Sequence, residues 1–207
     1  MEFKTLLKQH GIKWIKPDNL STFLSILNNN HNDLKEWYET VQNILNDNYK
    51  LLLRFVLLSG LRKGEAIKSF NIIIDLARNG KLNEYYDSDL SILQHFKYPM
   101  FLRGTKNAYI SILPNDLIQQ ISNSKHVTYP TIHKFLERRH IKLRLKELRS
   151  YYASYLRKRG IISELVDLIQ GRIGRDVFIR HYLKENPKNL SEQVLAILKD
   201  LEQSIAT

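Results

Sequence analysis

The sequence contains no cysteine, and this absence excludes several kinds of chemistry. Disulfide frameworks and zinc sites built on cysteine thiolates both need this residue. A thiol nucleophile is excluded for the same reason. Any covalent chemistry in this protein must therefore use another side chain.

Long apolar runs are also lacking. The longest apolar stretch, Leu51 to Leu58, is interrupted by Arg54 and falls far short of the roughly 20 residues that a membrane-spanning helix needs. The N-terminal residues, Met1 to His10, mix charged and apolar side chains and contain no apolar secretion core that ends in small residues. We therefore expect no membrane partner and no signal peptide, and place the protein in the cytoplasm.

Acidic residues are few relative to basic ones. The chain of 207 residues has 32 Lys and Arg against 21 Asp and Glu, which gives a formal net charge of +11. Such a field attracts polyanions, because lysines and arginines release counterions from a phosphate backbone when they bind it. Nucleic acid is the leading partner class, although anionic lipid or simple solubility would also explain the charge.

The residue pattern predicts one mainly helical folding unit, and 43% hydrophobic content is enough to fill its core. Residues 1–46 are expected to form a helical lead-in that belongs to the same unit as a core over residues 47–187. Within that core, Tyr49 to Leu58 predicts a buried helix that Ser59-Gly60 ends. Residues 188–207 predict a C-terminal helix whose apolar stripe docks on its own domain or on a neighbouring subunit.

A small β component is expected near the middle of the chain. Tyr98 to Leu102 and Tyr109 to Leu113 have the composition of two strands, and the turn 103–107 between them contains a glycine. Lys106 would lie at the tip of this antiparallel hairpin. Helical patterns follow over residues 115–123, 130–140, 144–158 and 163–169. The predicted fold class is mainly α with a small antiparallel β-hairpin or sheet.

Charged residues gather at the predicted helix ends and turns, together with one tyrosine. The set is Arg62, Lys106, Lys146, Arg149, Arg172 and Tyr182. In phosphoryl transfer the transition state carries extra negative charge, and guanidinium groups bind its nonbridging oxygens in a bidentate manner. Three arginines and two lysines around one tyrosine suit that chemistry, provided that the fold brings them together.

Four short motifs resemble those of the tyrosine recombinases. Ser59 to Glu65 is similar to the first arginine box of that family, a Gly-Leu-Arg whose arginine is followed by Glu three residues later. Lys106 resembles the family's β-turn lysine, and Lys146 to Arg149 falls where most members have His-x-x-Arg. Leu168 to Arg172 resembles the Leu-Leu-Gly-His box, and Tyr182 follows it by a gap close to the family's usual one.

Two positions depart from the common family pattern. Lys146 stands in place of the first family histidine, and Arg172 replaces the second histidine or tryptophan. This pair resembles the integrases of fusellovirus-type archaeal viruses and related archaeal plasmids. Because lysine and arginine are mostly protonated near neutral pH, proton transfer at the tyrosine cannot rely on a neutral imidazole at these two positions.

The resemblance implies a site-specific recombinase that cleaves and rejoins double-stranded DNA attachment sites. It assigns Tyr182 as the nucleophile, which forms a 3′-phosphotyrosyl link and frees a 5′-hydroxyl. The three arginines of the set would stabilise the phosphate, Lys106 would act as general acid, and Lys146 would bind phosphate or transfer a proton. It implies no metal ion or other cofactor, a role in viral genome integration within the host cell, and self-association to a tetramer on DNA.

Several residue assignments stay open on the sequence alone. Arg103 is a second candidate for a phosphate contact at the turn, and Arg175 could take the place of Arg172. Lys146 and Arg149 could also belong to the solvated face of their helix. Three further tyrosines compete for the role of nucleophile: Tyr151, Tyr152 and Tyr155.

Two other functions fit part of the same pattern. A type IB topoisomerase uses a similar set of Arg, Lys, Arg and Tyr, and relaxes supercoils without exchanging strand partners. A non-catalytic helical DNA-binding module would use these residues only to contact phosphates. The order of the motifs argues against the module, and the Lys-x-x-Arg box favours an integrase over a topoisomerase.

Overall fold

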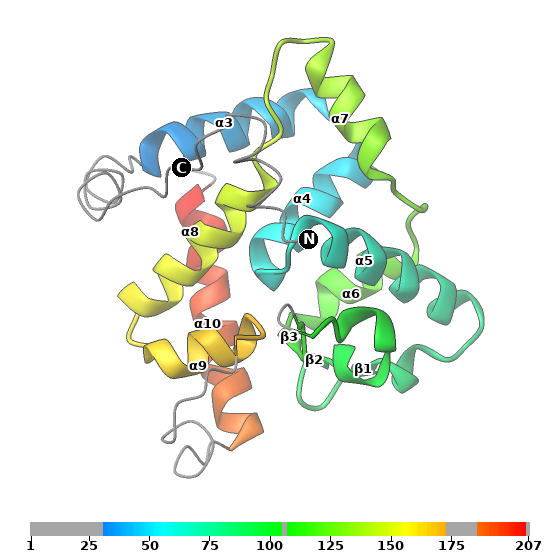
Figure 1. Cartoon of the computed structure of the whole chain (residues 1–207), viewed down its shortest axis with the longest axis vertical. Helices are drawn as coiled ribbons and strands as arrows, with labels where there is room; N and C mark the ends of the chain where they lie inside the picture. The colour runs from blue at the N-terminus through cyan, green and yellow to red at the C-terminus, as the bar shows by residue number, and fades with distance from the viewer. Residues whose placement is uncertain (1–30, 105–106, 173–185, 206–207) are drawn as a thin grey trace, which may run out of the picture. The chain divides into compact units, whose positions relative to one another are not determined.

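The computed structural model describes residues 31–104, 107–172 and 186–205. The chain divides into two compact units, residues 1–33 and residues 34–207. The helices and strands in Figure 1 belong to the second unit, apart from the first residues of helix α3.

A buried helix, α4 (Asp47–Ser59), forms the centre of this unit. It begins after Asn46, whose side chain accepts a hydrogen bond from the Tyr49 amide at 3.1 Å. It ends at Gly60, which adopts a left-handed φ of 59°. Every residue from Leu52 to Ser59 is buried except Arg54. The predicted buried helix and its stop at Gly60 are therefore confirmed.

Three helices pack directly against α4. Helices α5 (Lys63–Arg78), α6 (Asn115–Ser122) and α8 (Leu145–Lys158) pack against it, with α5 and α8 on either side in Figure 1. Leu148, Tyr152 and Leu156 lie on one face of α8 and are fully buried, as their spacing of four residues requires. Helix α3 (His31–Ile44) is tied to the start of α8 by Trp37, whose indole N–H donates to the Lys142 carbonyl at 2.8 Å.

A small antiparallel sheet follows α5 and a single 3-10 turn, η1 (Leu82–Glu84). Its strands are β1 (Tyr86–Asp87), β2 (Ile92–Leu93) and β3 (Ser111–Ile112), in the order β1-β2-β3. The register pairs Tyr86 with Leu93 and Leu93 with Ser111. Strand β3 also packs against α4, so the sheet is anchored to the central helix.

The predicted strand at Tyr98 to Leu102 is wrong. Two 3-10 turns, η2 (His95–Lys97) and η3 (Pro99–Phe101), occupy this part of the chain. Pro99 has no N–H to donate to a strand ladder, and its fixed φ suits the first position of a helical turn instead. The chain still doubles back at this point, because the amide of Ala108 donates to the Phe101 carbonyl at 2.9 Å. The second predicted strand is confirmed only at Ser111–Ile112, and its partner is β2.

The remaining helices are α7 (Tyr129–Glu137), α9 (Ser163–Ile169) and α10 (Pro187–Ile205). Helix α10 packs on α8 and β3 of its own chain through an apolar stripe of five residues: Leu190, Val194, Leu198, Leu201 and Ile205. A contact of this helix with a second subunit stays a prediction. The predicted fold class, mainly helical with a small antiparallel sheet, is confirmed. None of the described helices is both long and apolar enough to cross a membrane.

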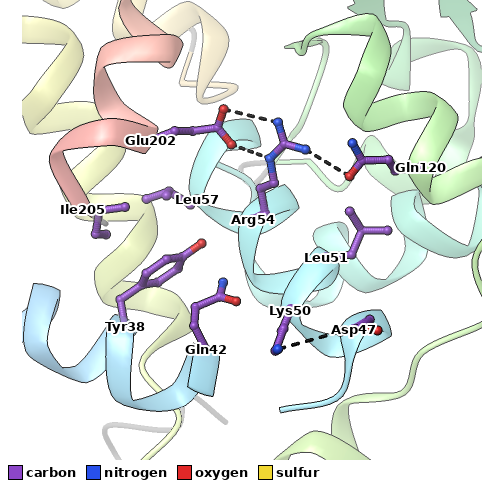
Figure 2. Close-up of a pocket in the computed structure, with 10 residues that line it drawn as sticks. All are labelled: Tyr38, Gln42, Asp47, Lys50, Leu51, Arg54, Leu57, Gln120, Glu202 and Ile205. Atoms are coloured by element: carbon purple, nitrogen blue, oxygen red, sulfur yellow. Dashed lines mark hydrogen bonds and ion pairs between the residues drawn. The ribbon is translucent and has the colours of Figure 1, made fainter. Parts of the chain in front are cut away.

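Arg54, which interrupts the apolar stretch of α4, links this helix to two others (Figure 2). Its Nε and Nη2 donate to the Glu202 carboxylate of α10, and its Nη1 donates to Gln120 of α6 at 3.2 Å. Nη2 also donates to Asp116 of α6 at 3.1 Å. A partly buried guanidinium needs such partners to offset its desolvation. The arginine within the apolar run therefore holds α6 and α10 against the central helix.

His95 is completely buried in a polar network that reaches Ser59, the last residue of α4. Its Nε2 lies 2.8 Å from the Ser111 hydroxyl, and its Nδ1 lies 2.5 Å from the Tyr85 hydroxyl. The Ser111 hydroxyl also donates to the Ser59 carbonyl at 3.4 Å. Burial lowers the pKa of His95 to about 3, so the ring is neutral in the folded protein near neutral pH.

We predict that lowering the pH from 6.5 to 5 removes about 1.5 kcal/mol of unfolding free energy through His95. Between pH 6.5 and pH 5 only the unfolded chain binds a proton on the His95 ring. The contribution of His95 to the free energy of unfolding is therefore fully present above pH 6.5 and is lost as the pH falls. Urea unfolding at both pH values would measure the change. His95→Gln should lose this part of the pH dependence, and an equal change in wild type and variant would contradict the assignment.

Candidate active site

An open cleft of about 540 Å³ collects four of the predicted site residues. The start of α5, one face of α8 and the end of α9 contribute its walls. The lining residues are Arg62, Lys63, Lys146, Arg149, Ser150, Ala153, Gln170 and Arg172. Five of these described residues are cations and none is acidic, so the cleft favours an anionic ligand.

Arg62 is held at the N-terminal end of α5 by the carboxylate of Glu65. Its main-chain amide donates to Glu65 Oε2 at 3.0 Å, and its Nη1 donates to Glu65 Oε1 at 2.8 Å. Nη1 also donates to the Asn107 carbonyl at 3.1 Å. Glu65 is only 2% exposed, so the direction of the Arg62 side chain is fixed by a buried partner. The N-terminus of α5 adds a partial positive charge at the same point.

Arg149 is the most deeply buried cation of the cleft, with 7% of its surface exposed. Its Nη1 donates to the Gly60 carbonyl, and its Nη2 donates to the Gln170 carbonyl at 3.0 Å. Both partners are neutral main-chain groups, so neither contact neutralises the guanidinium. Burial, followed by the neighbouring charge of Arg62, lowers the pKa of Arg149 to about 10. The positive charge of Arg172 acts in the same direction.

Gln170 is a site residue that the sequence analysis missed. Its side-chain Nε2 donates to the Arg149 carbonyl at 3.2 Å, while its own carbonyl accepts from the Arg149 guanidinium. The residue is 3% exposed and lies directly after α9. These reciprocal bonds join α8 to the end of α9. A glutamine between Ile169 and Gly171 carried no sequence signal, because its partner lies 21 residues away.

Gly171 places Arg172 beside Asn107, which precedes β3 in the sequence. Gly171 has a φ of +71°, and a Cβ built on it would lie 1.9 Å from the Asn107 carbonyl oxygen. The main chain at Gly171 therefore packs directly on that of Asn107, the residue that also binds Arg62. Arg172 then enters the cleft, where its Nη1 lies 3.4 Å from Asp167 Oδ1.

The structure thus brings together Arg62, Lys146, Arg149 and Arg172. Lys146 is exposed and lies one helical turn before Arg149 on α8. The other predicted site residues lie outside the described residues: Lys106, Tyr182 and the alternative Arg175.

The three tyrosines that competed with Tyr182 are all core residues. Tyr151, Tyr152 and Tyr155 are 6%, 0% and 9% exposed. The Tyr152 ring packs so closely on Gly60 that a Cβ there would lie 2.4 Å from its Cδ1, and burial raises the pKa of its hydroxyl. Groups packed in this way are poorly placed to reach a DNA backbone.

A mainly helical domain with a small antiparallel sheet and a cleft of converging arginines and lysines is consistent with the catalytic domain of an integrase. Residues 26–189 match the family described as archaeal phage integrase, and the chain belongs to that family. Membership indicates site-specific recombination and a DNA substrate, as the motifs predicted. No curated protein and no solved structure matches the chain at a significant level.

We predict that Gly171→Ala damages the site more than Gly160→Ala. Both glycines have positive φ, 71° and 95°, so alanine costs roughly 1–2 kcal/mol of backbone strain at either position. At Gly171 the added Cβ would clash with main-chain atoms. At Gly160 no atom lies within 4 Å of the added Cβ. Hydrogen exchange at the Ala108 amide should accelerate only in the Gly171 variant. Equal acceleration in both variants would disprove the packing of Gly171 on this turn.

Proposed function

We propose that the protein is a tyrosine recombinase that cuts and rejoins DNA through Tyr182. The observation that carries this proposal is the convergence of Arg62, Arg149 and Arg172 on one cleft, around a buried guanidinium whose hydrogen bonds leave its charge unneutralised. A phosphodiester is the anion that a DNA substrate would bring to this cleft. Guanidinium groups bind the nonbridging oxygens of a phosphate in a bidentate manner and keep their own charge.

The environment of Arg149 gives a physical reason for phosphate to bind at this position. The lowered pKa means that the surroundings disfavour the charged form of a group that nevertheless stays charged at neutral pH. The Glu65 carboxylate offsets this only in part, and a bound phosphate would add further negative charge. Because the transition state of phosphoryl transfer is more negative than the bound diester, the same cations would stabilise it more strongly than the substrate.

In the proposed first step the Tyr182 oxygen bonds to phosphorus while the bond from phosphorus to the 5′ oxygen breaks. The phenol loses its proton and the leaving oxygen gains one, which yields a 3′-phosphotyrosyl link and a 5′-hydroxyl. We assign the proton given to the leaving oxygen to Lys106, and assign Lys146 to phosphate binding or proton transfer. Rejoining reverses the step with the 5′-hydroxyl of a partner strand, so one phosphodiester replaces another without ATP hydrolysis.

A basic surface on α7, the helix whose first residue contacts the cleft residue Lys63, supports duplex DNA as the ligand. Lys63, which lines the cleft, lies 4.0 Å from the centroid of the Tyr129 ring at the start of α7. Farther along α7 and just after it, three cations are exposed and form what we call the α7 basic surface: Lys134, Arg138 and Arg139. DNA that places one phosphate in the cleft would run on to this surface.

Complete recombination requires cleavage of both strands in two duplexes. We therefore propose that the working assembly is a tetramer on paired DNA sites, with residues 47–187 as the catalytic core of each subunit. The exposed arginines and lysines around each cleft would hold the duplexes during exchange.

We predict that Tyr182→Phe abolishes covalent attachment to DNA and leaves DNA binding intact, because only the nucleophilic oxygen is removed. The assay incubates wild type and variant with a nicked suicide substrate, from which the cleaved strand dissociates, followed by denaturing gel electrophoresis. Wild type should form a slow-migrating adduct, and Tyr182→Phe should form none. An adduct of the variant at the wild-type level would place the nucleophile elsewhere.

We also predict that the α7 basic surface contributes to the salt dependence of DNA binding. Replacing its three cations by Gln should reduce the slope of log binding constant against log salt by about 0.9 for each DNA phosphate that the variant no longer neutralises. A charge-matched control replaces three exposed cations on other elements: Arg78, Lys188 and Lys199. The slope should change less in the control, and identical slopes for the two triple variants would exclude a specific contact at α7.

A further inference from the structure

Glu65 is shared by two arginines, and only one of them lines the cleft. Its Oε1 accepts from Arg62 Nη1 at 2.8 Å and from Arg103 Nη2 at 2.6 Å. The carboxylate is 2% exposed, whereas the Arg103 side chain is 48% exposed. Arg103 itself lies outside the cleft lining. Arg103 therefore reaches the same buried carboxylate as a site arginine.

The contacts around Glu65 close into a ring. The main-chain amide of Arg103 donates to Asn107 Oδ1 at 2.8 Å, and the Asn107 side chain donates to the Gly104 carbonyl at 2.9 Å. The Asn107 carbonyl in turn accepts from Arg62 at 3.1 Å. Arg62, Glu65, Arg103 and Asn107 thus hold one another, and a change at Arg103 reaches Arg62 through both Glu65 and Asn107.

Two guanidinium groups in this ring share one carboxylate. Arg62 and Glu65 alone form a neutral ion pair, since one guanidinium (+1) and one carboxylate (−1) sum to zero. Adding Arg103 leaves a net charge of +1, because two guanidinium groups face a single carboxylate. Without Arg103, the buried carboxylate would be compensated by Arg62 alone and would compete with a ligand for the Arg62 charge.

We propose that Arg103 is a positioning residue that keeps the charge of Arg62 available to the scissile phosphate by sharing Glu65 with it. This inference rests on the proposed function, in which Arg62 stabilises that phosphate. Arg103 then affects the rate of cleavage without touching the reacting atoms. Its contribution is electrostatic, so it depends on the negative charge of the substrate phosphate.

The test compares Arg103→Gln with Arg103→Lys in single-turnover cleavage. Glutamine retains a donor for Glu65 and loses the charge, whereas lysine retains the charge. Arg78→Gln is the matched control, since Arg78 is an exposed arginine at the far end of α5, the helix that Arg62 precedes. The DNA is a duplex that contains the position at which wild type forms its covalent adduct, mapped beforehand by sequencing.

Each variant is assayed on ordinary DNA and on DNA with a neutral methylphosphonate at the scissile position. On ordinary DNA, Arg103→Gln should cleave roughly 10- to 100-fold more slowly than wild type, and Arg103→Lys should recover most of the rate. On the methylphosphonate, which lacks one anionic nonbridging oxygen and therefore carries one negative charge less in both the ground state and the transition state, the Arg103→Gln defect should shrink to less than about 3-fold. Arg78→Gln should match wild type on both substrates.

Two results would overturn the inference while leaving the proposed function intact. One is an Arg103→Gln rate equal to that of Arg78→Gln. The other is a defect of Arg103→Gln that is equally large on both substrates, which would mean loss of structure rather than of charge. Arg62→Ala is measured in parallel. If the methylphosphonate does not relieve the defect of Arg62→Ala, the proposed role of Arg62 fails, and the inference about Arg103 fails with it.

Discussion

The arrangement of the cleft depends on the buried guanidinium of Arg149. It binds the carbonyl of Gly60, two residues before Arg62, and the carbonyl of Gln170, two residues before Arg172. One side chain of α8 therefore sets the distance between the two turns that carry the other arginines. Both turns contain glycines with left-handed φ, which allows the main chain to approach Tyr152 at one end and Asn107 at the other.

A site without imidazole at Lys146 and Arg172 has to work mainly through fixed positive charge. The positive charges of the cleft repel one another. Two features of the structure hold these side chains in place despite that repulsion. Arg149 is held by neutral carbonyls, and Arg62 shares the buried Glu65 with Arg103. A bound phosphate would lower this mutual repulsion, as the proposed function requires.

Much of the helical fold could be predicted from periodicity and from glycine stops, as α4 and Gly60 illustrate. The prediction of a strand at Tyr98 to Leu102 was wrong because it gave more weight to the strand-like composition than to Pro99. Pro99 has no N–H to donate to a strand ladder, and it begins a 3-10 turn instead. Motif order predicted that Arg62, Arg149 and Arg172 share a site. The bonds of Gln170 and Arg103 could not be predicted, because they join segments that are 21 and 38 residues apart and belong to no local pattern.

The central claim is that a phosphotyrosyl bond forms at Tyr182, and the most direct measurement is the identity of the residue attached to DNA. Trypsin digestion of the covalent complex, followed by nuclease treatment and mass spectrometry, would locate the nucleotide remnant. Cleavage after Arg180 and Lys184 gives the peptide 181–184, whose single tyrosine is Tyr182. We predict that the nucleotide is on this peptide. A nucleotide on peptide 150–157, which holds the buried tyrosines of α8, would contradict the account.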